Sequence, residues 1–183
     1  MPDVKVVLDG ADMRRTLVRI AHEIVEGSPE AERLALVGIH RRGAVLATRL
    51  QHALSGLLDA EVARGDLDIS FYRDDLSTRS GAPVVHASHL DFEVDGRTVV
   101  IVDDVLFTGR TVRAALEALF DYGRPARVRL AVLADRGHRE LPVRPDYVGK
   151  NLPTSRAERV EVRVEEIDGV DEVAIVSMQE ALA

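Results

Sequence analysis

The hydrophobic pattern of the chain shows short apolar runs separated by segments of a different, helical spacing. The runs at 34–39, 99–102 and 127–134 are rich in Val, Leu, Ile and Ala. Runs of this composition and length predict strands buried on both faces of a parallel sheet. Since the runs alternate with helical segments, we expect an α/β fold whose central sheet is parallel and is flanked by helices.

Three segments, at 13–24, 45–57 and 112–120, carry apolar residues at every third or fourth position, and this spacing predicts amphipathic helices. Each helix is expected to turn one apolar stripe toward the sheet. The residues expected to face inward are Met13, Leu17, Ile20, Ala21, Ile24, Val45, Leu46, Leu50, Ala53, Leu54, Leu57, Val112, Ala115, Leu116, Leu119 and Phe120.

The N-terminal part of the chain contains two further strand signals. Residues 4–8 predict a short strand, followed by a helix that Asp9 or Asp12 caps and that Gly27 ends. Residues 66–72 alternate between apolar and polar side chains, which predicts another strand.

Two segments lack periodicity, and two short apolar segments follow them near the C-terminus. Residues 73–83 are polar and charged and predict a surface loop. Residues 143–155 form a long irregular stretch, and an irregular segment of that length is interpreted as functional or lid-like. Residues 160–167 and 171–178 predict a closing hairpin.

The length of 183 residues suits one domain, spanning 1–183, with a small appendage. No apolar run approaches the roughly 18 residues of a membrane span, and no charged-then-apolar leader opens the chain, so a cytoplasmic protein is expected. The absence of cysteine excludes disulfides and thiolate chemistry. The net charge of −7 argues against indiscriminate nucleic-acid binding, although it leaves room for a local basic patch.

The first candidate site follows the apolar run at 99–102. Asp103 and Asp104 come directly after the run, and a loop with Thr108, Gly109 and Thr111 precedes the next helix. Glycine lets backbone amides approach a phosphate at a helix N-terminus, and hydroxyls donate to the same oxygens. The paired carboxylates suit a ribose diol, or a positive charge that develops during reaction. Together these features predict chemistry at the anomeric carbon of a sugar phosphate.

A second candidate anion site follows the run at 34–39. A tight turn there contains His40, Arg41, Arg42 and Gly43, again between a strand and a helix. Two anion loops at the ends of two parallel strands would meet at the same edge of the sheet.

The run Val-Ile-Val-Asp-Asp-Val-Leu-Phe-Thr-Gly-Arg-Thr at 100–111 resembles the phosphoribosyl pyrophosphate (PRPP) signature of the type I phosphoribosyltransferases. The resemblance implies that the acids Asp103 and Asp104 are catalytic and that 40–43 is the pyrophosphate loop. It also implies a flexible lid over the reacting centre that includes Arg73, Asp74 and Asp75, with Arg73 as a candidate pyrophosphate contact. The 5′-phosphate loop would consist of Val105, Leu106, Phe107, Thr108, Gly109, Arg110 and Thr111.

Three more stretches, at 70–77, 133–142 and 147–155, look like the pyrimidine operon attenuation regulators, which are uracil phosphoribosyltransferases that also bind the leader of pyrimidine biosynthetic mRNA. This resemblance implies a five-stranded parallel sheet and a hood built from about 1–10 and 143–183. It places Asp135, Arg136 and Val160 near the base, and it implies a homodimer or homotetramer that binds UMP or UTP. Magnesium would be carried by PRPP, with no dedicated protein site.

The first predicted helix carries Arg15, Arg19 and His22 on its polar face. A solvated basic face is the plain interpretation. The resemblance instead favours a face that binds pyr leader RNA, extended by His138 and Arg139, although Val18 stands where family members often have a hydroxyl. Two alternatives remain open: a phosphoribosyltransferase for another base without an RNA role, and an RNA-binding regulator whose catalysis has decayed.

Overall fold

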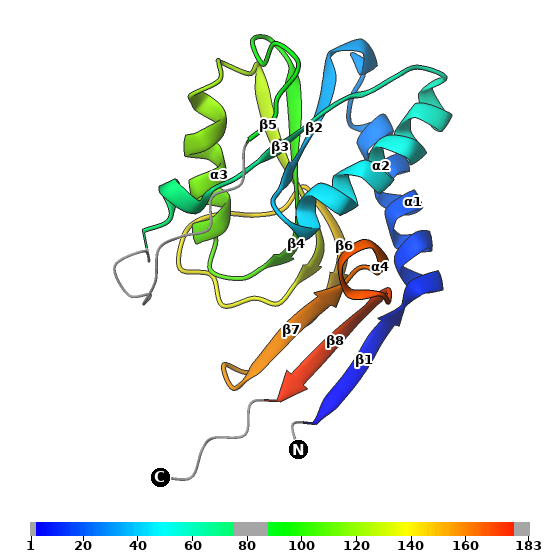
Figure 1. Ribbon diagram of the computed structural model, residues 1–183, viewed down its shortest axis with the longest axis vertical. Coiled ribbons are helices and arrows are strands. Elements are labelled where there is room, and N and C mark those ends of the chain that lie inside the picture. Colours follow the sequence, from blue (N-terminus) through cyan, green and yellow to red (C-terminus); the bar gives the residue numbers. More distant parts are fainter. Residues whose placement is uncertain (1–2, 75–87, 178–183) are drawn as a thin grey trace.

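The computed structural model describes residues 3–74 and 88–177, which form two sheets (Figure 1). The larger sheet is parallel, with strand order β3-β2-β4-β5-β6, and the smaller sheet is antiparallel, with order β1-β8-β7. The strands are β1 (Val4–Asp9), β2 (Leu34–Ile39), β3 (Ala63–Leu67), β4 (Thr98–Leu106), β5 (Arg127–Asp135), β6 (Tyr147–Asn151), β7 (Glu158–Arg163) and β8 (Glu172–Ser177). The predicted α/β class, with a parallel sheet and a small hood, is confirmed.

Helices cover both faces of the larger sheet, with α1 and α2 on one side and α3 on the other (Figure 1). The α-helices are α1 (Gly10–Glu26), α2 (Arg42–Leu58), α3 (Arg110–Phe120) and α4 (Glu165–Asp168), and the 3₁₀ turns are η1 (Ala31–Arg33) and η2 (Ser70–Tyr72). No helix in 3–74 or 88–177 is long and apolar enough to cross a membrane.

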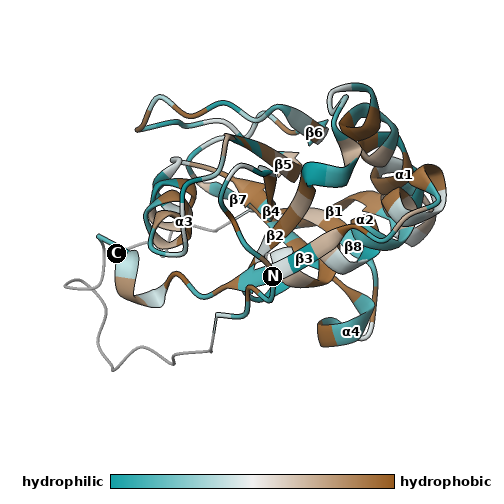
Figure 2. Cartoon of the chain, turned by 90° about the horizontal axis from the view of Figure 1, so that it is seen from above, coloured by the Kyte–Doolittle hydropathy of each residue, from teal (hydrophilic) through white to brown (hydrophobic). Residues whose placement is uncertain are grey.

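Side-chain alternation along β4 explains why the sheet has two cores. Val100 and Val102 lie in the cluster with α1 and α2, whereas Val99 and Ile101 lie in the cluster with α3. A strand between two helical layers must be apolar at every position, which is the pattern that the run at 99–102 shows. Figure 2 shows brown, hydrophobic segments along the central strands and helices of mixed colour around them.

The smaller sheet is the hood, and it joins the two ends of the chain. Val4 in β1 pairs with Val176 in β8, and β7 pairs with the other edge of β8. Val162, Val164 and Val173 belong to the same buried cluster as α1 and α2, so the hood shares a core with the larger sheet. The hood lies beyond the carboxyl ends of the central strands (Figure 1).

Both aspartates that were candidates for the helix cap take part in capping α1. The Asp9 carboxylate accepts from the Asp12 amide at 2.8 Å, and the Asp12 carboxylate accepts from the Asp9 amide at 3.2 Å. This reciprocal pairing satisfies two amide groups that the first helical turn leaves without partners. Gly27 ends the helix as expected.

The strand predicted at 66–72 is wrong in position. The strand in this region is β3, which begins at Ala63 and ends at Leu67, and Ser70–Tyr72 is a 3₁₀ turn. The Asp68 carboxylate accepts from the Ser70 amide at 2.8 Å and from the Ser70 hydroxyl at 2.5 Å, which turns the chain away from the sheet. Asp68 and Ser70 are both polar and each stands between apolar residues, so this turn shows the same alternating pattern in the sequence as a strand.

The segment 143–155 was predicted to be irregular, but it contains β6, the fifth strand of the larger sheet. Strand β6 therefore does not belong to the hood, although it lies within the 143–183 segment assigned there. An edge strand has one neighbour and shows little apolar periodicity. A side chain on Gly149 would put its Cβ 2.3 Å from the Leu133 carbonyl oxygen and 2.8 Å from the Thr16 side chain, so β6 packs tightly.

Two inward-facing residues and the closing hairpin also need correction. Leu57 and Phe120 are 42% and 54% exposed, because each lies in the last turn of its helix. The hairpin strands β7 and β8 are joined through the short helix α4 rather than by a tight turn.

We predict that Gly38→Ala lowers the free energy of unfolding by about 1–3 kcal/mol, because the added Cβ would lie 2.5 Å from the Ala44 Cα atom. Gly56→Ala in α2 is the control: its Cβ would meet no atom of the described residues within 4 Å, so the substitution should stabilise the protein by about 0.5–1 kcal/mol. Urea unfolding measures both. Equal effects of the two substitutions would contradict the close approach of β2 to α2.

Candidate functional site

The candidate site lies at the hood-facing edge of the larger sheet, where β2 and β4 end. One cavity of about 310 Å³ extends over the loop after β4, and another of about 370 Å³ adjoins the loop after β2. Asp103, Val105, Thr111 and Arg73 line both cavities. The two loops that the sequence singled out therefore border one continuous region.

The acidic pair forms the floor of this region. The Asp103 carboxylate accepts from the Asp104 amide at 2.9 Å, and the Asp104 carboxylate accepts from the Val105 amide at 2.7 Å. Burial raises the pKa of Asp103 well above its usual value, and the neighbouring Asp104 carboxylate adds to the rise. Burial also raises the pKa of Asp104, although the Val105 amide and Arg42 oppose it. The pair is thus held in place by its own backbone.

The loop after β4 has the shape that a phosphate site requires. Gly109 has φ +94°, a conformation that L side chains rarely adopt, and it precedes the first turn of α3. The amides of the loop therefore lie at a helix N-terminus, where the helix dipole favours an anion. The Thr108 hydroxyl accepts from the Arg110 amide at 3.3 Å, which tightens the turn.

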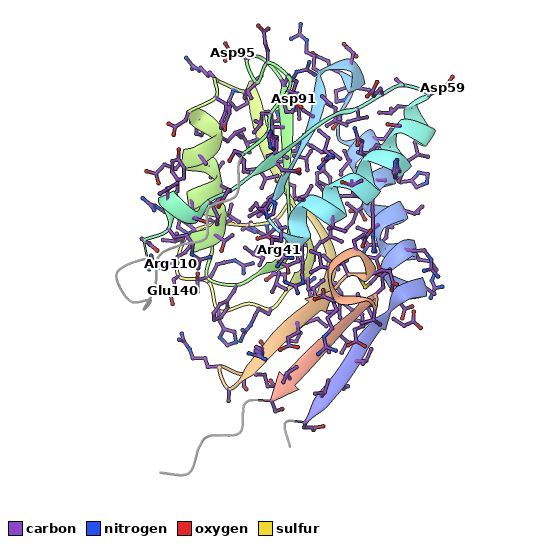
Figure 3. All side chains as sticks on the ribbon, viewed as in Figure 1. Arg41, Asp59, Asp91, Asp95, Arg110 and Glu140 are labelled. Atoms are coloured by element: carbon purple, nitrogen blue, oxygen red, sulfur yellow. The ribbon has the colours of Figure 1, made fainter. Side chains whose placement is uncertain are left out.

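A segment after β5 supports this loop from behind. The Thr108 carbonyl accepts from the amides of Glu140 and Leu141, at 2.9 and 3.1 Å. Arg110 contacts Glu140 at 3.0 Å and Asp74 at 2.5 Å, so its guanidinium bridges α3, the supporting segment and the chain just after η2. Figure 3 shows Arg110 and Glu140 side by side, with Arg41 nearer the middle of the molecule.

The two arginines of the loop after β2 have different surroundings. Arg41 is exposed and lines the cavity that also contains Asp103 and Asp104. Arg42 begins α2, and its guanidinium makes two hydrogen bonds to Asp168 of α4, at 2.7 and 3.1 Å. His40 also lines the cavity, and a Cβ on Gly43 would lie 2.5 Å from the Val102 carbonyl oxygen, which makes glycine necessary there.

Arg136, one of the residues assigned to the base, is buried and well anchored. Its guanidinium lies 4.0 Å from the centre of the Phe107 ring and donates to the Glu158 carbonyl at 2.6 Å. Burial lowers its pKa. Asp135 accepts from the Gly137 amide at 3.0 Å and from Arg139 at 2.5 Å, and Val160 packs half-buried against the core. Asp135 thus shapes the turn after β5.

Arg15, Arg19 and His22 lie on the exposed face of α1, as the pattern predicted. Arg15 pairs with Asp12 at 2.6 Å, and Arg19 pairs with Glu23 at 2.7 Å. Arg19 also donates to the carbonyls of Val148 and Gly149 in β6, at 3.1 and 2.6 Å. Part of the hydrogen-bonding capacity of Arg19 therefore holds α1 to the sheet.

His138 and Arg139, the other two candidates for RNA contact, adjoin the loop after β4. Arg139 donates to the carbonyls of Phe107 and Val143, at 2.8 and 3.0 Å, besides Asp135. A ring nitrogen of His138 lies 2.6 Å from the Thr154 carbonyl oxygen, and its ring meets Phe107 edge-on at 6.0 Å. Both side chains therefore support the site loop, whichever further role they have.

Of the three lid residues, Arg73 lines both cavities, Asp74 pairs with Arg110, and Asp75 lies outside the described residues. Sequence reasoning missed Asp168 and Glu140, which hold Arg42 and Arg110. It also missed the stacking of Arg136 on Phe107. No local signal marks these contacts, because each joins residues that are far apart in the sequence.

A magnesium ion carried by a substrate fits the chemistry of this region. Within 3–74 and 88–177, no three His, Asp or Glu side chains gather closely enough to hold a metal ion. Asp103 and Asp104 nevertheless line a cavity, and magnesium ordinarily keeps several waters and takes only one or two protein carboxylates.

Comparisons with known proteins by sequence all indicate the same family. The model of the phosphoribosyl transferase domain family matches residues 4–166. The protein named bifunctional protein PyrR from Roseiflexus sp. (strain RS-1) is 60% identical over 173 residues, covering 94% of each chain. The proteins of the same name from Deinococcus radiodurans and Listeria monocytogenes serotype 4a are 55% and 52% identical, covering 92% and 96% of this chain and 92% and 97% of their own.

Solved structures agree at the level of the fold. The hypoxanthine phosphoribosyltransferase of Trypanosoma cruzi superposes with a TM-score of 0.71 at 19% identity, covering 96% of this chain and 97% of its own. The hypoxanthine phosphoribosyltransferase of Staphylococcus aureus gives 0.69 at 18% identity, covering 98% and 94%. At these identities the likeness establishes the architecture alone.

We predict that Asp103→Asn stabilises the protein at neutral pH. The folded protein raises the pKa of Asp103, so the ionised form disfavours folding, and that cost grows as pH rises above the unfolded value of about 3.9. Asparagine has no charge and still accepts from the Asp104 amide. Thermal unfolding from pH 4 to pH 8 should show a gain in Tm that increases with pH. A gain that is constant over this range would contradict the raised pKa.

Proposed function

The chain belongs to the phosphoribosyl transferase domain family and, within it, to the PyrR proteins, and from this membership we propose two linked activities. The protein transfers the phosphoribosyl group of PRPP to uracil, giving UMP and pyrophosphate. It also binds the leader of pyr mRNA and attenuates transcription. The observation that carries the proposal is the acidic pair, with Asp103 buried, directly before a glycine-containing loop at the start of α3, in a chain 60% identical to a bifunctional PyrR protein.

The loop at 108–111 binds the 5′-phosphate of PRPP. Its amides lie at the start of α3, and the hydroxyls of Thr108 and Thr111 donate to the phosphate oxygens. Arg41 and Arg73 line the cavity on the other side of the acidic pair, where they supply positive charge for pyrophosphate. The substrate therefore extends across the acidic pair from one anion loop to the other.

The reaction is a displacement at the anomeric carbon. The bond from C1′ to the pyrophosphate oxygen breaks, the bond from C1′ to uracil N1 forms, and the N1 proton passes to the released pyrophosphate. Positive charge grows on the sugar as pyrophosphate departs, and the carboxylates of Asp103 and Asp104, which line the cavity, stabilise it and accept hydrogen bonds from the ribose hydroxyls. Positioning and electrostatics supply most of the acceleration.

Magnesium enters with PRPP. Asp103 and Asp104 are the residues that would lie near it, and the ion would supply positive charge to offset that of the departing pyrophosphate.

The exposed face of α1, with Arg15, Arg19 and His22, is the proposed RNA surface. A local basic face can bind RNA although the chain carries a net charge of −7, because phosphate contacts act over short distances at physiological salt. UMP or UTP in the nucleotide site raises the affinity for the leader, which couples pyrimidine supply to attenuation. The protein acts in the cytoplasm as a homodimer or homotetramer.

Incubation with uracil, PRPP and magnesium should yield UMP, and hypoxanthine, guanine and orotate should not compete as acceptors. Asp104→Asn should lower kcat by about tenfold or more, because one neutralised carboxylate removes stabilisation from the transition state. Turnover with another base would favour a phosphoribosyltransferase without the RNA role. No turnover with any base would favour an RNA regulator with decayed catalysis.

His22→Ala and Arg15→Gln should weaken leader binding about three- to tenfold each and leave UMP formation unchanged, because these side chains are exposed on α1 and line neither cavity. Arg113→Gln on α3 removes the same charge from an exposed position off this face and is the control. Filter binding with labelled leader RNA measures the affinities. Equal losses in Arg113→Gln and Arg15→Gln would mean that only the overall charge matters.

A further inference from the structure

Strand β7 is held by an arginine near each of its ends. At its start, Arg136 donates to the carbonyls of Ser155 and Glu158, at 3.3 and 2.6 Å. Beyond its other end, Arg42 makes two hydrogen bonds to Asp168 of α4. Arg136 follows β5 and Arg42 follows β2, so both arginines come from the site edge of the larger sheet.

The contact between Arg42 and Asp168 is built more firmly than a surface ion pair. Both carboxylate oxygens are engaged, and one of them also accepts from the Val164 amide at 2.9 Å, directly after β7. The side chains are 34% and 18% exposed. Bidentate pairs of this kind fix direction as well as distance.

A second arginine of α2 strengthens the same junction. Arg49 contacts Asp171 at 2.7 Å and Glu166 at 2.6 Å, and its side chain is 19% exposed. Arg42 and Arg49 lie two turns apart along α2, on the side that faces α4. The hood is therefore attached to α2 by a row of ion pairs in addition to its apolar contacts.

The sequence assigned Arg41 and Arg42 to one pyrophosphate loop, but the two side chains have different surroundings. Arg41 lines the cavity with Asp103 and Asp104, whereas Arg42 is not among the residues that line it. The Arg42 guanidinium already donates to both carboxylate oxygens of Asp168, so fewer of its donors remain for pyrophosphate than in Arg41, which lines the cavity.

We propose that Arg42 is a positioning residue for uracil binding: through Asp168 it fixes β7, whose start is joined by Arg136 to Phe107 of the loop after β4, and Arg41 is the arginine that contacts pyrophosphate. The proposal rests on the uracil transfer proposed above. A flat pyrimidine is recognised through hydrogen bonds of about 2.9 Å to its edges, so a small displacement of β7 weakens base binding. The loop after β2 keeps the hydrogen bond from the His40 amide to the Leu67 carbonyl, and the loop after β4 keeps those that Thr108 accepts from the segment after β5, so PRPP binding should change less than base binding.

The kinetic test compares Asp168→Asn, Arg42→Gln, the double variant and Arg41→Gln. Asp168→Asn should raise the KM for uracil about tenfold and the KM for PRPP less than about twofold. The double variant should match Asp168→Asn within about twofold in the KM for uracil, because two residues that act through one contact are not additive. Arg41→Gln should instead raise the KM for PRPP. Equal increases in the KM for uracil and the KM for PRPP in Asp168→Asn would overturn the proposal.

A readout without turnover separates this proposal from the proposed reaction. Hydrogen–deuterium exchange of the amides at 158–163 should be faster in Asp168→Asn than in the natural protein. Arg33→Gln, an exposed residue at the other end of the larger sheet, should leave their exchange unchanged. Absence of uracil transfer in the natural protein would refute the reaction alone. Unchanged exchange in Asp168→Asn would refute the role of Arg42, whatever the reaction.

Discussion

Repulsion between negative charges is the constraint around which the site is arranged. Asp103 and Asp104 lie at the end of a buried strand and line the cavity in which we propose that a phosphorylated substrate binds. The protein carries a net charge of −7, so the compensating cations have to be concentrated locally. Such a concentration of cations is found around the site edge, where the residues include Arg41, Arg42, Arg73, Arg110, Arg136 and Arg139.

These arginines act in different ways. Arg41 and Arg73 line the cavity, whereas Arg136 and Arg139 donate mainly to backbone carbonyls and hold the loops in place. Arginine suits this second task because its guanidinium remains charged when buried and presents several donors in one plane. A charge count from the sequence cannot separate the two groups, because the distinction depends on neighbours that only the folded chain provides.

The sequence predicted the parts of the site that are contiguous along the chain. Strand β4, the acidic pair and the loop before α3 lie within 98–111, so their local chemistry could be read directly. The contact of Arg42 with Asp168 joins residues 126 positions apart, and no residue close to Arg42 in the sequence indicates that Asp168 is its partner. Strand β6 was missed for a related reason: its pairing with β5 comes from the backbone, and Gly149 and Lys150 give no apolar signal.

Pairing of the first strand with the last also sets an order of events during protein synthesis. Among the strands that the structure describes, β1 pairs only with β8, and β8 consists of residues 172–177, so the hood cannot assemble until these residues have left the ribosome. The elements of the larger sheet emerge earlier and can fold first. A nascent chain would therefore present the basic face of α1 before β7 and β8 are in place, so chains released early by a ribosome would lack the hood while their larger sheet could still form.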